Sequence, residues 1–213
     1  MRRTYPSLMT VESVLNAEWN KWAQNSRGAT PEHQLIVPFM RMLAGPMDFH
    51  SGGFRSVRPE DYSPRDIAPM VIGTRCRQLA MFVVYENYLP MVTDYPAAYR
   101  KQPSLEFLAQ VPTSWDEMRA LNAAVGDSIT VARRSGKQWY VGSMAAGGAR
   151  ESAIPLKFLG AGKYTAEIWA DDRDAPDQPL QLIFRRSEVT AADTIWATLA
   201  SAGGHVIRLT PAR

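Results

Sequence analysis

Residues 129–144, ITVARRSGKQWYVGSM, contain two runs of alternating apolar and polar side chains separated by the turn signal Ser135-Gly136. Such runs predict β-strands, because successive side chains of a strand point to opposite faces of a sheet. Four more runs of this kind follow, and turns rich in glycine separate them. Six short strands within about 100 residues are typical of an antiparallel β-sandwich. The predicted strands are 129–133, 139–144, 153–158, 164–169, 180–184 and 205–209.

The chain before this region has a different pattern. Residues 1–112 alternate helical patterns with short strands and with loops rich in proline and glycine. We therefore expect an α/β part over 1–112 and an all-β part over 113–213. Helices are predicted after Pro31 and over 74–87, 95–101 and 104–110.

One short strand of the α/β part carries a polar residue near its end. The helix that starts at Pro31 is broken at Gly45-Pro46, and the run Met47-Asp48-Phe49 follows at once. In a parallel α/β barrel, polar residues at the C-terminal ends of strands face the active site. Asp48 is therefore a candidate site residue, although an Asp in this position also caps turns.

Two acidic residues near the N-terminus, Glu12 and Glu18, are six positions apart. On a regular helix this spacing rotates the second side chain by roughly 240° and moves it about 9 Å along the axis, so the carboxylates would not share a face. They converge only if the segment is a loop or a distorted turn. Aromatic residues beside carboxylates suit a sugar-binding cleft, whereas the simpler alternative is a solvated helix with scattered Glu and Trp. The nearby aromatic residues are Tyr5, Trp19 and Trp22.

Six segments together resemble the C-terminal part of glycoside hydrolase family 97, whose members are calcium-dependent α-glucosidases and α-galactosidases. They occur in the family's order and extend over most of the chain. The segments are RRTYPSLMTVES at 2–13, TPEHQLIVPFMRMLAGPMDF at 30–49, GGFRSVRPEDY at 52–62, GTRCRQLAMFVVYENYLPMVTDYPAAY at 73–99, EFLAQVPTSWDEMRAL at 106–121, and ITVARRSGKQWYVGSM at 129–144.

The resemblance implies a fold, a reaction and roles for residues. Residues 1–112 would be the C-terminal portion of a (β/α)8 TIM barrel, and 113–213 the β-sandwich that follows it. Glu18 aligns with the general acid that protonates the departing glycosidic oxygen. Glu12 aligns with a carboxylate that ligates calcium, which takes several hard oxygen ligands. Oligosaccharides or α-glycosides would be the substrates.

This chain also departs from the family pattern. The base or nucleophile and further calcium ligands of family members lie upstream, so we expect residues 1–213 alone to be inactive. We also expect 1–112 to be poorly stable alone, and the sandwich to fold by itself. The alternative function is a non-catalytic sandwich, either structural or carbohydrate-binding. The residues do not distinguish glucosides from galactosides, or retention from inversion.

Other features limit the remaining possibilities. His50 lies in a flexible Ser-Gly-Gly loop that could close on substrate, although a loop residue without a role is the simpler reading. The formal net charge is +3 with scattered basic residues, which argues against nucleic-acid binding. The single Cys76 excludes an intrachain disulfide and is expected to be buried.

The sequence also bears on membranes, zinc and location. No apolar run reaches transmembrane length, so no membrane span is expected. Three histidines without metal-ligand spacing argue against a zinc site. The resemblance implies that the full-length protein is periplasmic or secreted. The oligomeric state stays open.

Overall fold

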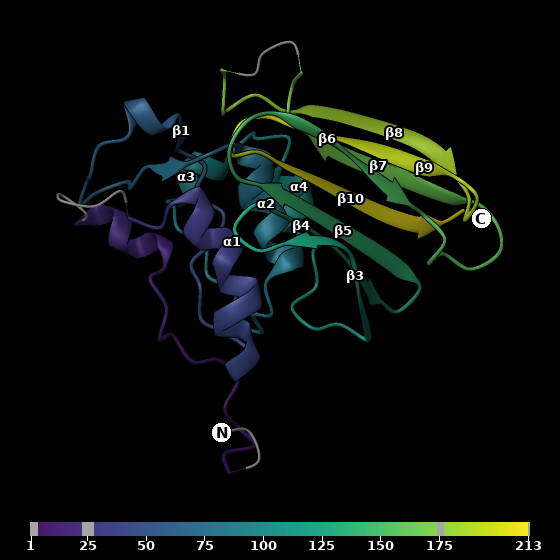
Figure 1. Cartoon of the computed structure of the whole chain (residues 1–213), viewed down its shortest axis with the longest axis horizontal. Coiled ribbons are helices and arrows are strands. Elements are labelled where there is room, and N and C mark those ends of the chain that lie inside the picture. Colours follow the sequence, from purple (N-terminus) through teal and green to yellow (C-terminus); the bar gives the residue numbers. More distant parts are fainter. Residues whose placement is uncertain (1–3, 23–27, 174–176, 213) are drawn as a thin grey trace.

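A computed structural model describes residues 4–22, 28–173 and 177–212. Its largest element is a six-stranded antiparallel sheet with the order β3-β4-β5-β10-β7-β8 (Figure 1). A second, two-stranded antiparallel sheet pairs β6 with β9. The strands are β3 Glu117–Ala124, β4 Ser128–Ser135, β5 Gln138–Ala145, β6 Arg150–Pro155, β7 Tyr164–Ala170, β8 Ile183–Val189, β9 Thr194–Leu199 and β10 Gly204–Pro211. The expectation of antiparallel β structure in the C-terminal part of the chain is confirmed.

The six-stranded sheet is covered on both faces. One face packs against β6 and β9 through a buried cluster that includes Trp139, Ile168 and Ile207. The opposite face packs against the helical part through residues such as Tyr140, Trp169 and Val206. Because neighbouring residues of a strand point to opposite faces, Tyr140 and Trp139 belong to different clusters. The sheet is therefore a middle layer, and the second layer of the expected sandwich is only two strands wide.

The edges of this sheet are open among the described residues. Edge strands β3 and β8 are mostly exposed, and Met118 and Phe184 on them are 56% and 44% exposed. Trp196 on β9, a strand of the smaller sheet, is exposed like Met118 and Phe184.

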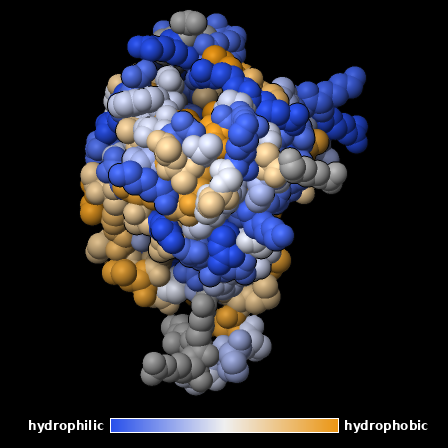
Figure 2. Space-filling model, turned by 90° about the vertical axis from the view of Figure 1, so that its right-hand side faces the viewer, coloured by the Kyte–Doolittle hydropathy of each residue, from blue (hydrophilic) through white to orange (hydrophobic). Residues whose placement is uncertain are grey.

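Figure 2 shows that hydrophilic and apolar side chains are mixed on the side of the molecule where the sheets lie.

The main helix of the molecule, α2 Arg75–Val84, lies against the inner face of the six-stranded sheet (Figure 1). Thr74 caps its N-terminus by accepting a hydrogen bond from the backbone N–H of Arg77. Nine of its ten residues are buried, including Cys76, so the prediction of a buried thiol is confirmed. The predicted helix 74–87 is correct in position, although it ends at Val84 because Tyr85 is extended.

The rest of the N-terminal part contains short elements. The helix after Pro31 begins as expected and tightens into a 3-10 turn that ends at Gly45, where φ is 111°. The predicted helices at 95–101 and 104–110 are each a single turn. None of the helices among residues 4–22, 28–173 and 177–212 is long and apolar enough to cross a membrane. The elements are η1 Ala17–Lys21, α1 Pro31–Met40, η2 Arg41–Ala44, η3 Pro59–Asp61, α3 Pro96–Tyr99 and α4 Leu105–Leu108.

Parallel strand pairing in the N-terminal part is limited to short pieces. Strands β1 Ser56–Val57 and β2 Val71–Ile72 pair in parallel, and single parallel bridges join Val11 to Met47 and Ser51 to Val92. These pairings do not close a barrel among the described residues. A barrel requires hydrogen bonding from each parallel strand to the next. The barrel portion that we expected over residues 1–112 is therefore not shown by the described residues.

Candidate active site

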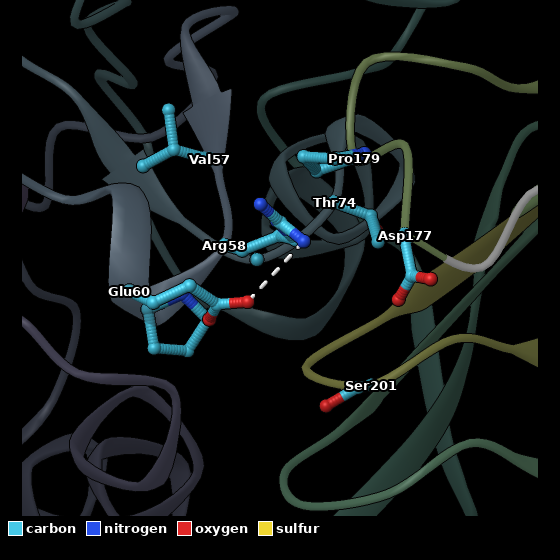
Figure 3. A pocket seen from close by; sticks show the side chains of 9 residues that line it. Val57, Arg58, Glu60, Thr74, Asp177, Pro179 and Ser201 are labelled. Atoms are coloured by element: carbon cyan, nitrogen blue, oxygen red, sulfur yellow. Dashed lines mark ion pairs between the residues drawn. The ribbon is translucent and has the colours of Figure 1, made fainter.

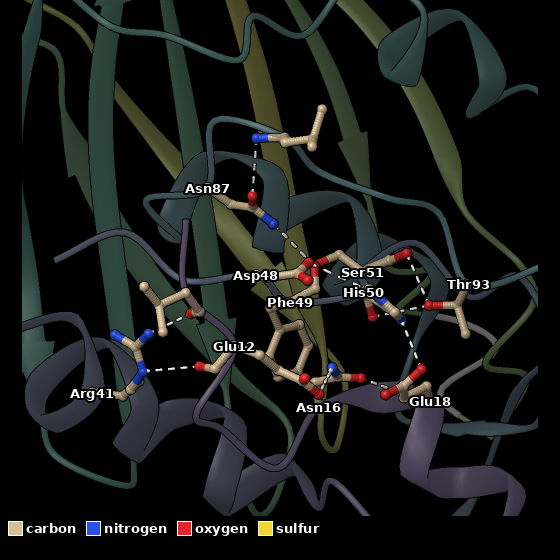
Figure 4. Close-up of polar contacts among 12 residues, drawn as sticks. Glu12, Asn16, Glu18, Arg41, Asp48, Phe49, His50, Ser51, Asn87 and Thr93 are labelled. Atoms are coloured by element: carbon tan, nitrogen blue, oxygen red, sulfur yellow. Dashed lines mark hydrogen bonds and ion pairs between the residues drawn. The ribbon is translucent and has the colours of Figure 1, made fainter. Parts of the chain in front are cut away.

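Glu12 and Asp48 lie on neighbouring extended segments. The parallel bridge between Val11 and Met47 places the segments side by side, and the backbone N–H of Asp48 donates to the carbonyl of Val11 over 3.1 Å. The two acidic residues each follow the paired residue of their own segment (Figure 4). The predicted strand at 47–49 is thus a single bridge, which nevertheless presents Asp48 at its end.

A buried asparagine links the two glutamates. Asn16 donates from Nδ2 to Oε1 of Glu12 over 3.1 Å, and its Oδ1 accepts from the backbone N–H of Glu18 over 2.8 Å. The second contact is a helix N-cap, since η1 begins at Ala17. The segment between the glutamates is irregular (Figure 4). On a regular helix, two residues six positions apart could not both face one site, so this irregularity is what the spacing requires.

His50 lies between the carboxylates of Glu18 and Asp48. Its Nδ1 is 3.6 Å from Oε2 of Glu18, and its Nε2 is 3.7 Å from Oδ1 of Asp48. Both distances exceed those of good hydrogen bonds, so each contact becomes an ion pair only when the imidazole is protonated. Oδ1 of Asp48 is buried and has no hydrogen-bond partner. The three side chains remain 19–31% exposed and can reach a ligand.

The backbone around His50 is fixed by hydrogen bonds from two neighbouring side chains. The hydroxyl of Thr93 contacts the carbonyls of His50 and Ser51 at 2.9 and 3.0 Å. Nδ2 of Asn87 donates to the carbonyl of Phe49 over 3.1 Å. The segment carrying Asp48 and His50 is therefore held from the chain that follows α2, as Figure 4 shows.

Comparison with known proteins identifies the family. Residues 114–210 match the family model described as "Glycosyl-hydrolase 97 C-terminal, oligomerisation". The chain is 38% identical over 176 residues to a retaining alpha-galactosidase from Bacteroides thetaiotaomicron, a match that covers 82% of this chain and 26% of that protein. The chain belongs to glycoside hydrolase family 97. The resemblance of the six sequence segments to this family is thereby confirmed.

Two further relatives agree with this assignment. A probable retaining alpha-galactosidase from Streptomyces bingchenggensis is 31% identical over 205 residues, which are 96% of this chain and 28% of that protein. A family 97 enzyme from Pseudoalteromonas sp. strain K8, solved in complex with acarbose, has a TM-score of 0.86 at 35% identity. That match covers 100% of this chain and 33% of the solved chain. This family 97 chain spans about a quarter of the length of its curated relatives.

The calcium ion implied by the family resemblance can be tested against the residues present. Glu12 is exposed, and its carboxylate is the hard oxygen donor that calcium prefers. Calcium takes 6–8 oxygen ligands, yet no group of three or more His, Cys, Asp or Glu among the described residues could hold a metal ion. Glu12 therefore fits as one ligand, and most of the coordination shell would have to come from other groups.

Sequence reasoning missed the role of Asn16. No spacing rule connects this residue to Glu12. The available signal was an Asn before an Ala-Glu-Trp turn, which is a common N-cap position. The aromatic side chains expected beside the acids are exposed. The rings of Trp19 and Trp22 are in edge-to-face contact, and their centroids are 5.7 Å apart.

Proposed function

We propose that this chain supplies the general acid and one calcium ligand to the active site of an α-glycosidase. The observation that carries the proposal is the convergence of Glu12, Glu18, Asp48 and His50 on one polar site, with Glu18 tied to Glu12 through Asn16. The family assignment supports it, and the names of the two curated relatives favour α-galactosides as substrates.

Glu18 is proposed as the acid because its carboxyl group is positioned but accessible. Its backbone N–H is held by Asn16, and 31% of its side chain is exposed to a ligand. Protonation of the departing oxygen by such a carboxyl group is one half of glycoside hydrolysis. Asp48 and His50 are proposed to contact sugar hydroxyls, since a carboxylate and an imidazole can accept or donate those hydrogen bonds.

Glu12 is proposed as a calcium ligand, and calcium when bound would stabilise negative charge that develops near the cleaved bond. Asn16 would orient Glu12 by donating to one carboxylate oxygen, which leaves the other oxygen for the ion. Residues 1–112 are proposed to form the C-terminal portion of a TIM barrel. The second catalytic carboxylate and the remaining ligands are proposed to lie upstream of this chain, on the earlier strands of that barrel. The active protein is proposed to be periplasmic or secreted.

The test uses the complete gene product that contains this sequence, with melibiose and an aryl α-galactoside of good leaving ability as substrates. An aryl leaving group needs little protonation, so Glu18→Gln should lower kcat on melibiose by about 10²-fold or more and affect the aryl substrate much less. Glu60→Gln is the matched control, because that exposed glutamate pairs with Arg58 away from the site. Equal losses of activity on both substrates would refute the acid role of Glu18.

The calcium role has a separate test in the same protein. Glu12→Gln should raise the calcium concentration required for half-maximal activity by about tenfold, because a charged ligand is lost. A chelator should abolish activity reversibly. An unchanged calcium requirement in Glu12→Gln would contradict the assignment. The non-catalytic alternative would gain support if the complete gene product bound oligosaccharides but hydrolysed neither substrate.

A further inference from the structure

A second site of the molecule carries an excess of positive charge. A cavity of about 470 Å³ lies between the loop at 54–57, the start of α2 and the turn of α3. Its wall includes Arg55, Arg65 and Arg75 but no aspartate or glutamate. The three arginines follow one another at intervals of ten residues in the chain, and the fold brings them to one cavity.

Only one of these charges is neutralised by a neighbouring carboxylate. Arg55 pairs with Asp94, whose side chain is fully buried, over 3.1 Å. Arg75 instead donates to Oε1 of Gln102 over 2.7 Å and lies over the ring of Phe54 at 5.0 Å. Among the described residues, neither Arg65 nor Arg75 forms an ion pair, so two cations face the cavity without a counter-charge.

Two buried donors in the wall also lack partners. Nε of Arg75 and the hydroxyl of Ser56 have no hydrogen-bond partner in the structure. The residues are only 8% and 1% exposed, so water does not freely solvate them. A buried donor without a partner is unfavourable, and a charged donor is more so. Oxygen atoms of an anion are the complement of such a wall.

A neighbouring cavity provides a contrast. It has a volume of about 110 Å³ and is also lined by an arginine, Arg58 (Figure 3). Here Arg58 pairs with Glu60 over 3.4 Å, and Asp177 lines the same wall. Its lining thus carries one positive and two negative charges, and its volume is small. The larger cavity, with three arginines and no carboxylate, therefore differs from its smaller neighbour in the sign of its charge.

We propose that the larger cavity binds a small organic acid of monosaccharide size, such as a uronic acid, with its carboxylate between Arg65 and Arg75. Its volume lies within the range of sites for small organic ligands, whereas an inorganic ion would fill only part of it. The site lies apart from Glu12 and Glu18, and the proposal does not depend on the hydrolase activity. Gln102 offers a polar contact for a hydroxyl group of the ligand.

The test is a titration of this chain with galacturonate, followed by ¹⁵N NMR of the arginine Nε–H groups and of the backbone. Galacturonate should shift the Nε–H signal of Arg75, and added salt should weaken binding. Neutral galactose should bind at least about tenfold more weakly, because it lacks the group that forms charge-assisted bonds. Inorganic phosphate is the second comparison, and phosphate binding as tight as that of galacturonate would overturn the assignment of an organic acid.

Variants locate the binding site. Arg65→Gln removes an exposed cation of the wall and should weaken galacturonate binding about tenfold without affecting folding. Arg100→Gln is the matched control, since Arg100 is exposed and lies outside this cavity. Absence of galacturonate binding, or equal binding by both variants, would overturn the proposal.

Discussion

Replacement of Gly204 by alanine should destabilise the protein by forcing β10 and α2 apart. A Cβ atom at Gly204 would lie 2.3 Å from Cα of Arg77 and 2.4 Å from its backbone nitrogen. These atoms belong to the helix backbone and cannot rotate away, so α2 must move by roughly 1 Å to restore ordinary contact.

The cost follows from how tightly α2 is held. Nine of its ten residues are buried, and the buried guanidinium of Arg77 donates to the carbonyls of Ala145 and Pro31 and to Oε1 of Gln34 at 2.5–2.7 Å. Overpacking of a core costs about 1–3 kcal/mol. We expect the upper end of this range, because a shift of α2 would disturb all three hydrogen bonds of Arg77 at once. For a chain of this size, that loss lowers Tm by about 6–12 °C.

The assay is urea unfolding followed by tryptophan fluorescence and circular dichroism, with Gly148→Ala as control. A Cβ at Gly148 meets no atom within 4 Å, so this variant should stay within about 0.5 kcal/mol of the parent protein. Gly142→Ala, whose Cβ would lie 2.8 Å from Cβ of Val83, provides a second displacement of the same helix. The double variant should lose less than the sum of the single losses, because one shift of α2 relieves both clashes. If Gly204→Ala were as stable as Gly148→Ala, the proposed close packing would be refuted.

Three further predictions concern the sheet. Burial lowers the pKa of His205 to about 3. Below about pH 6.5 the unfolded state therefore binds a proton that the folded state does not, and the stability of the protein should fall as the pH drops. His205→Gln should reduce this loss by up to about 1.4 kcal/mol per pH unit, as measured by urea unfolding at several pH values. Glu167→Gln should cost about 3 kcal/mol, because it removes the close partner of the 8% exposed Arg208 and leaves only Glu106, at 4.0 Å. Glu188→Gln, at the exposed pair with Lys163, should leave stability nearly unchanged, and similar losses in the two variants would contradict the burial argument. An isolated fragment of residues 113–213 should bind a hydrophobic dye, because one face of its sheet loses the helices that cover it. A fragment that binds no dye and unfolds in a sharp transition would instead support the independent folding expected from the sequence.

Strands were predictable from sequence where one or both faces are buried. Residues 129–144 show alternation because β4 and β5 alternate between two clusters, and their turn at Gly136 has a φ of 58°. Strand β3 escaped prediction because its sequence, EMRALNAA, is mostly exposed and rich in helix formers. Its conformation depends on pairing with β4, which is tertiary information. Strand β9 was missed as well, and the strand expected at 180–184 extends over 183–189 as β8.

The structure places the candidate site residues named from sequence near one another. Glu12, Glu18, Asp48 and His50 were identified from sequence, and the structure brings them to one polar site. Their roles stay predictions. Spacing along the chain could not reveal the arginine cavity, because each of its cations belongs to a different loop or helix end and the pattern exists only after folding.

The sheet and the candidate site are joined through α2. The helix packs on the sheet at Gly204, and the chain that leaves the helix contacts the segment 47–50 directly. The carbonyl of Glu86 accepts from the backbone N–H of Met47 over 3.0 Å, and Asn87 holds the carbonyl two residues later. A displacement of α2 by Gly204→Ala would therefore reach the segment that carries two of the candidate site residues. The β region supplies none of these residues, yet it is linked through α2 to the segment that carries Asp48 and His50.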